Sequence, residues 1–247
     1  MAALDRAGAA RAARAAHTGR RDCPDHRLRF TLLAAAVIAA FLGSFLLGRY
    51  DVSLSMVLKV LWYGITSWAA RLFGAGAPVA RTWETAAEAV VLNIRLPRIV
   101  TAAVVGAALS CAGAAYQGMF RNPMVSPDIL GASTGAGFGA AVGILLSFGR
   151  AGITATAFCF GLAAVLLAAL ISRASRIAAT LAMVLSGIMV GSLFSSGTAL
   201  VKLAADTEQQ LPAITYWLMG SLASVKAADA LFVTVAVLLG LIPLMLL

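Results

Sequence analysis

Apolar residues fall in long blocks along the chain, and short polar segments separate one block from the next. A helix needs about 20 apolar residues to cross the hydrocarbon core of a bilayer. Six blocks are long enough: residues 30–48, 99–118, 129–148, 153–172, 180–203 and 230–247. No ionisable residue lies at the centre of any of them. The pattern predicts an all-α, polytopic membrane protein with about six transmembrane helices.

The segment 51–93 has a different pattern, because its apolar residues recur at helical spacing with polar residues between them. The apolar positions are Leu54, Val57, Leu58, Leu61, Ile65, Trp68 and Leu72. This spacing predicts an amphipathic helix on the outer membrane surface, with Trp62 and Trp68 at the headgroup boundary. A short extra span is the alternative, and it would invert the orientation of everything downstream. Lys59 and the Gly/Pro break at residues 74–78 disfavour that alternative.

Composition supports a membrane location. The chain is 61% hydrophobic and 12% charged, whereas soluble chains are roughly half apolar and a quarter charged. The net charge of +9 does not indicate nucleic-acid binding, because the basic residues lie at the ends of apolar blocks. Seven arginines against three aspartates in residues 1–29 place the N-terminus in the cytoplasm. We expect residues 1–29 to be a disordered basic tail and residues 30–247 to form one domain in the cytoplasmic (inner) membrane.

The predicted outer segment 49–98 is unusually basic for an extracytoplasmic face. Its basic residues are Arg49, Lys59, Arg71, Arg81, Arg95 and Arg98. A docking surface for an acidic partner is one explanation, since arginine forms bidentate contacts with carboxylates.

Small residues recur at four-residue spacing in three of the blocks, which places them on one face of each helix. They are Gly106, Ser110, Ala114 and Gly118; Gly131, Gly135, Gly139 and Gly143; and Gly187, Gly191, Ser195 and Ala199. Such faces allow close backbone approach within a membrane. The pattern predicts a tightly packed helical bundle.

Several functional classes are disfavoured by what the sequence lacks. No phosphate-binding GxxxxGK[ST] motif occurs, and both histidines lie in the N-terminal tail, so we expect no catalytic residue, cofactor or resident metal. ATP hydrolysis, if required, belongs to a partner. The lack of acidic residues inside the spans disfavours a proton- or sodium-coupled carrier. A secondary carrier or channel, or a membrane anchor without transport activity, remains an alternative.

Two motifs carry a resemblance to a known family. The run RLPR, followed by GAALSCAGAAYQGMFRNPMVSPDILGASTGAGFGA, resembles permease subunits of the FecCD/BtuC-like ABC importers, and the likeness extends over about residues 30–247. It implies a ten-helix fold of which this chain holds about six helices, and a paired permease subunit. Separate ATPase subunits and an extracytoplasmic binding protein are also implied. The expected cargo is an iron–siderophore complex, with cobalamin or haem as alternatives.

The resemblance also implies roles for individual residues. Arg95 and Arg98 would meet acidic residues of the binding protein. Asn122, Pro123 and Pro127 would form the inner turn, with Asp128 favoured by the following helix dipole, and Gly131, Gly135 and Gly139 would pack the helix after it. Thr180 would lie at an inner gate, and the candidates for the pathway are Gly187, Gly191, Ser195 and Ser196. The chain ends inside its sixth block, so we expect a truncated family member that lacks the coupling helix and cannot transport alone.

Overall fold

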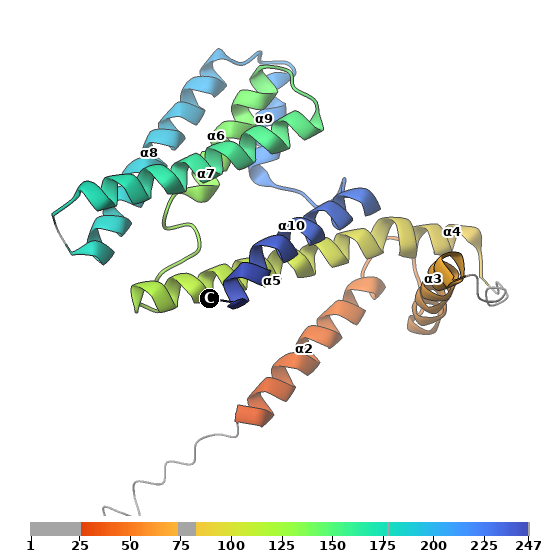
Figure 1. Ribbon diagram of the computed structural model, residues 1–247. Coiled ribbons are helices and arrows are strands. Elements are labelled where there is room, and N and C mark those ends of the chain that lie inside the picture. The colour runs from red at the N-terminus through yellow and green to blue at the C-terminus, as the bar shows by residue number, and fades with distance from the viewer. Residues whose placement is uncertain (1–25, 74–82, 177, 247) are drawn as a thin grey trace, which may run out of the picture. The chain divides into compact units, whose positions relative to one another are not determined.

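The computed structural model describes residues 26–73, 83–176 and 178–246, and within them the regular elements are all helical. The predicted tail lies outside these residues except for its last four, which begin helix α2 (His26–Leu46). The chain divides into two compact units, Met1–Ile99 and Val100–Leu247 (Figure 1). Each unit has its own packing.

The first unit is built around a short core between three helical segments. It contains α2, α3 (Leu54–Phe73), α4 (Thr85–Ala89), the π-helix η1 (Val90–Arg95) and the first residues of α5 (Leu96–Phe120). The core residues are Phe45, Val52, Val57, Val60 and Val91. π-Helical turns are rare and often occur at functional sites. This one lies immediately before the second predicted span.

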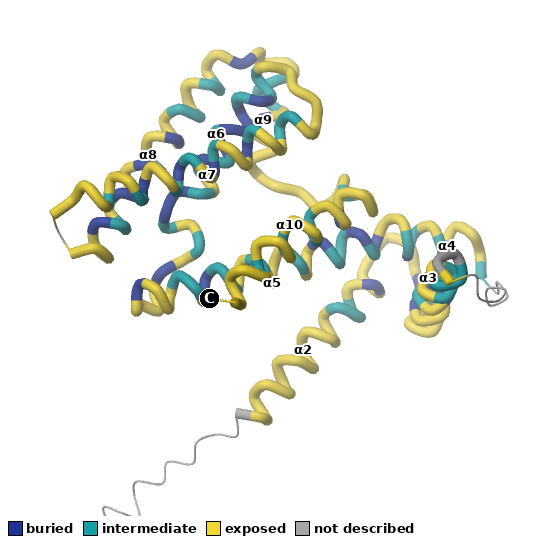
Figure 2. The backbone as a smooth tube through the Cα atoms, viewed as in Figure 1, coloured by how far each residue is buried: buried dark blue, intermediate teal, exposed yellow. Residues whose placement is uncertain are grey.

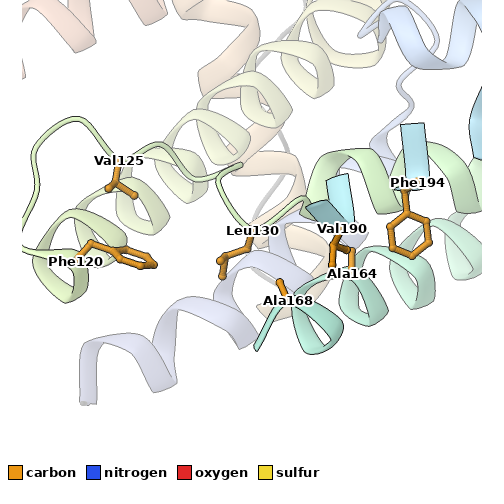
Figure 3. Packing of buried hydrophobic residues seen from close by; sticks show 7 residues of the cluster. All are labelled: Phe120, Val125, Leu130, Ala164, Ala168, Val190 and Phe194. Carbon is orange, nitrogen blue, oxygen red and sulfur yellow. The ribbon is translucent and has the colours of Figure 1, made fainter. Parts of the chain in front are cut away.

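The second unit centres on three helices that lie side by side (Figure 1). They are α6 (Ala132–Leu145), α7 (Arg150–Ala174) and α8 (Ala179–Ala204), followed by α9 (Gln210–Met219) and α10 (Ala227–Leu246). One phenylalanine from each of the three helices meets the others, with Phe138 and Phe160 ring centroids 5.1 Å apart and Phe138 and Phe194 5.5 Å apart. Figure 3 shows Phe194 beside Ala164 and Val190 in the buried cluster that continues to Leu130.

Five helices within the described residues are long and apolar enough to cross a membrane. They are 27–46, 85–120, 150–174, 179–204 and 227–246, and α3 is not among them. Much of the surface of α2 and α10 is exposed (Figure 2), and its side chains are largely apolar. Such surfaces are solvated by lipid in a membrane protein.

The predicted span 129–148 differs from the structure in length. Helix α6 has 14 residues, or about 21 Å at 1.5 Å per residue, which is shorter than the hydrocarbon core. Its start is set by Gly131, which has a left-handed φ of 75° and caps the helix. Its end is followed by Ser147, which also has a positive φ, of 56°. Turns at both ends therefore use residues that the hydrophobic pattern assigned to the helix.

Glycines bring α6 into backbone contact with α7. A Cβ added at Gly135 would lie 2.6 Å from the Phe160 carbonyl oxygen, and one at Gly139 would lie 2.8 Å from the Phe160 Cβ and collide with the Thr156 carbonyl oxygen. Gly143 continues this face. Gly131 departs from the predicted strip, because it precedes the helix and approaches Gly191 of α8 instead.

Helix α8 joins this bundle through a second close backbone contact. A Cβ at Gly187 would collide with the Ile129 carbonyl oxygen and lie 3.0 Å from the Leu130 Cα. One residue earlier, the buried Ser186 hydroxyl donates to the Ala168 carbonyl at 2.8 Å. Residues 129–131 are therefore held against α8 by backbone contact.

Gly139→Ala tests the contact between α6 and α7. The added methyl group must move the two helices apart, so we expect a loss of about 1–3 kcal/mol in stability, seen as a lower melting temperature of the detergent-solubilised protein. Gly106→Ala is the matched control, because nothing lies within 4 Å of a Cβ added there. Equal melting temperatures for the two variants would contradict the contact.

Candidate functional site

Arg95 is buried, with 8% of its surface exposed. Its Nη1 donates to the Phe45 carbonyl oxygen, and its Nη2 donates to the Tyr50 carbonyl oxygen at 2.5 Å. Phe45 lies in the last turn of α2, where carbonyls lack intrahelical partners and a cation is favoured by the helix dipole. Arg95 thus ties the end of α2 and the loop after it to the end of η1.

Gly48 makes room for this arrangement. A Cβ added there would collide with Nη2 of Arg95 and lie 3.0 Å from its Cζ. The loop therefore passes close to the guanidinium where glycine leaves space for it.

A cavity of about 440 Å³ adjoins the same loop, and acidic and aromatic side chains line it. Its lining residues are Tyr50, Asp51, Met56, Trp83, Glu84 and Ala87. The Tyr50 hydroxyl donates to Glu84 Oε2 at 3.3 Å. Desolvation, together with the nearby Glu84 carboxylate, raises the pKa of Tyr50, and the protonated phenol is the form that donates to Glu84.

The two arginines of the RLPR motif differ in their surroundings. Arg98 is half-buried and lies one helical turn after Arg95, so the two share a helix face. Both terminal nitrogens of Arg95 already donate to backbone carbonyls within the unit. Docking through Arg95 itself would require this buried side chain to become accessible to a partner, and loss of its hydrogen bonds in that movement would be costly for a buried charge.

The turn before α6 is held by its own side chains. The Asn122 Oδ1 accepts from the Met124 backbone amide at 2.9 Å, and the Asp128 Oδ1 accepts from that of Ser133 at 3.0 Å. Asp128 therefore caps the first turn of α6, where a negative charge is favoured. Pro127 lies against Gly113 of α5, where an added Cβ would be 3.5 Å from the Pro127 ring. Pro123 is exposed.

The structure separates the candidate pathway residues of α8 into two groups. Gly187 is buried against Ile129, and Gly191 is half-buried against Gly131. Ser195 continues the four-residue spacing of these glycines but is exposed, Ser196 is exposed on the side of the helix opposite Gly187, and Thr180 is exposed in the first turn. The two glycines are placed in helix packing, whereas the serines and Thr180 are open to their surroundings.

Sequence reasoning did not identify Ser192, Gly48 or Tyr50 as parts of these sites. Ser192 shares the exposed face of α8 with Ser196, whose hydroxyl donates to the Ser192 carbonyl at 2.9 Å. The four-residue spacing of Ser192 and Ser196 in the sequence already indicates that the two share a helix face. No sequence signal marks Gly48 or Tyr50, because their roles depend on Arg95 folding back onto the loop. The part of the chain that the structure describes contains no group of three His, Cys, Asp or Glu residues able to hold a metal.

Comparison with known proteins places this fold in a family. Residues 35–247 match the model of the FecCD transport family, and the chain belongs to that family. The structure resembles a solved structure described as an inward-facing conformation of a metal-chelate type ABC transporter, with a TM-score of 0.66 and 32% sequence identity. The similarity covers 84% of this chain and 57% of that one.

Curated relatives differ in the cargo that their names give. The chain is 34% identical to the molybdate import system permease protein MolB of Haemophilus influenzae over 86% of its own length and 59% of MolB. It is 37% identical to the cobalamin import system permease protein BtuC of Halobacterium salinarum, over 63% of this chain and 42% of BtuC. An iron chelatin transport system permease of Helicobacter pylori is 38% identical, over 64% of this chain and 47% of that relative. The chain thus spans about half the length of these relatives.

Arg95→Met tests the internal role of the buried arginine. Methionine keeps most of the side-chain volume and donates no hydrogen bond, so two carbonyls lose a charged donor and stability should fall by on the order of 3 kcal/mol. Gly48→Ala should lower the melting temperature too, since the methyl group displaces the guanidinium.

Arg49→Met is the control, because Arg49 is exposed on the same loop and its replacement should change stability by less than about 0.5 kcal/mol. A wild-type melting temperature for Arg95→Met would show that Arg95 does not hold the loop.

Proposed function

We propose that this chain is a membrane-spanning permease subunit of an ABC importer, or part of one. The family match over residues 35–247 carries the proposal, and the similarity to a metal-chelate type ABC transporter supports it. A second permease subunit, separate ATPase subunits and an extracytoplasmic binding protein complete the importer. Uptake by proteoliposomes that hold the full importer should require ATP and the binding protein, whereas a secondary carrier would need neither.

We propose a metal chelate as the cargo, with an iron–siderophore complex as the first candidate. The support is the resemblance to an iron chelatin permease and to a metal-chelate type transporter. Cobalamin remains the second candidate because of the similarity to BtuC, and MolB adds molybdate as a third. Binding of a ferric siderophore, cobalamin and molybdate to the cognate binding protein, compared by calorimetry, distinguishes the three. Tight binding of cobalamin or molybdate alone would reject the iron assignment.

We propose that the N-terminus is cytoplasmic and that the loop after α2 faces the outside, where the binding protein docks. The positive charge before α2 supports this orientation. In this arrangement Arg98 meets a carboxylate of the partner, and Arg95 holds the neighbouring loop 45–50 in place through Phe45 and Tyr50. This division of roles follows from the hydrogen bonds that Arg95 already makes.

Arg98→Glu tests docking. Reversing the charge places two carboxylates against each other, so the affinity for the binding protein should fall at least about ten-fold, a cost near 1.4 kcal/mol. Affinity is measured with immobilised permease in nanodiscs and soluble binding protein at low and moderate salt. Lys226→Glu is the control, since this exposed cation lies in the second unit, before α10.

Unchanged affinity of the Arg98→Glu variant would remove Arg98 from the docking surface. Labelling of an Arg49→Cys variant only from the cytoplasmic side would overturn the proposed orientation, independently of the affinity result.

We propose that the exposed face of α8 borders the translocation pathway, with Ser195 and Ser196 on it and Thr180 near its inner end. In a cysteine-free background, Ser195→Cys and Ser196→Cys should react with a membrane-impermeant maleimide, because a pathway contains water and lipid does not. Ser186→Cys is the control, since Ser186 is buried and bonded to Ala168. Failure of both serine variants to react, as for the control, would place this face in lipid or in a protein contact.

A further inference from the structure

Helix α3 has three distinct faces rather than the two of a simple amphipathic helix. At about 100° per residue, Val57, Val60 and Tyr63 fall in one sector of about 120°. Ser55, Lys59 and Thr66 form a narrower polar strip. The remaining sector holds the apolar stripe, which consists of Leu54, Leu58, Trp62, Ile65 and Trp68.

The first face belongs to the core of its own unit. Val57 and Val60 are fully buried beside Phe45 and Val91. Tyr63 is buried as well, and its ring meets that of Trp83 edge-on at 5.5 Å. Tyr63 is not among the apolar positions of the predicted helix, and its place in the core shows which side of α3 faces the protein.

The apolar stripe has no such cover within the described residues. The exposed fractions of its five side chains range from 43% for Leu54 to 65% for Trp68. The stripe follows the spacing of 54, 58, 62 and 65, so it is continuous along the helix. Five large apolar side chains on one open face indicate an interaction surface.

The polar strip places hydroxyl groups and one positive charge beside the apolar stripe. Lys59 and Ser55 are exposed, and the Thr66 hydroxyl is bonded to the Trp62 carbonyl at 2.9 Å. No aspartate or glutamate occurs in α3. A helix with tryptophans on one face, lysine beside them and no acidic residue suits the boundary between acyl chains and anionic headgroups.

The position of α3 in the chain favours lipid over a protein as the occupant. Only residues 47–53 separate α3 from α2, which is a candidate membrane span with a largely exposed apolar surface. Phe45 in the last turn of α2 packs with Val57 and Val60 of α3, which keeps α3 close to the end of that span.

We propose that α3 lies in the bilayer interface with the apolar stripe inserted among the lipids, the polar strip toward water and Val57, Val60 and Tyr63 toward the protein. The position of α3 in the interface then sets the depth, relative to the bilayer, of the loop held by Arg95. This role does not depend on the cargo or on the docking partner.

The test uses tryptophan fluorescence in vesicles of phosphatidylcholine and phosphatidylglycerol. Variants that keep a single tryptophan, with the other three changed to phenylalanine, are reconstituted with or without phosphatidylcholine brominated on its acyl chains. Trp62 and Trp68 should each lose about half of their emission, as expected for side chains at the interface. Trp83 is the matched control, because it is half-buried against Tyr63 in the same unit.

Stronger quenching by bromines near the headgroups than by bromines near the chain ends further supports an interfacial depth. Quenching of Trp62 and Trp68 no greater than that of Trp83 overturns the proposal. Acrylamide then identifies the actual surroundings: strong quenching means that the stripe faces water, and weak quenching means that another protein surface covers it.

Discussion

Close approach of one backbone to another is the constraint on which the second unit depends. Lipid solvates an apolar side chain as well as another helix does, so burial alone does not hold spans together. At Gly135, Gly139 and Gly187, the backbone of a helix or a turn takes the place of lipid, and no glycine Cβ separates the two backbone segments. The phenylalanines at 138, 160 and 194 then fill the space around these contacts. Specificity comes from the glycines, and the larger side chains add dispersion.

The first unit meets a related constraint with a charged side chain. Where α2 ends and the chain turns, the helix leaves carbonyl groups without partners, and these are costly to leave unpaired near a membrane. Arg95 supplies donors to Phe45 and to Tyr50, and Gly48 lets the loop close around it. A positive charge at the negative end of a helix is stabilised without a carboxylate partner. A motif that resembles a docking element can therefore also be a structural element of its own subunit.

These two devices support the proposed functional surfaces in different ways. Packing through glycine holds α6, α7 and the turn before α6 in one arrangement, while Ser192, Ser195 and Ser196 of α8 stay exposed. Tyr50 and Asp51, next to the loop fixed by Arg95, line a cavity of about 440 Å³. A rigid loop loses little conformational entropy when a partner binds. The surfaces proposed for docking and for the pathway are thus each supported from within their own unit.

Much of this architecture is readable from the sequence because its causes are local. Block length predicts the spans, four-residue spacing predicts that Gly135, Gly139 and Gly143 share a face, and Asp128 before a helix predicts a favourable charge at its start. Tertiary structure decided the rest. Gly131 leaves the helix for a left-handed turn that packs on α8, which shortens α6. Tyr63 lies in the core, where its ring contacts that of Trp83. Arg95 finds its acceptors 50 and 45 residues earlier in the chain. Hydrophobic periodicity records whether a residue avoids water, but lipid and protein are both apolar surroundings, so only the folded chain determines which of them a residue meets.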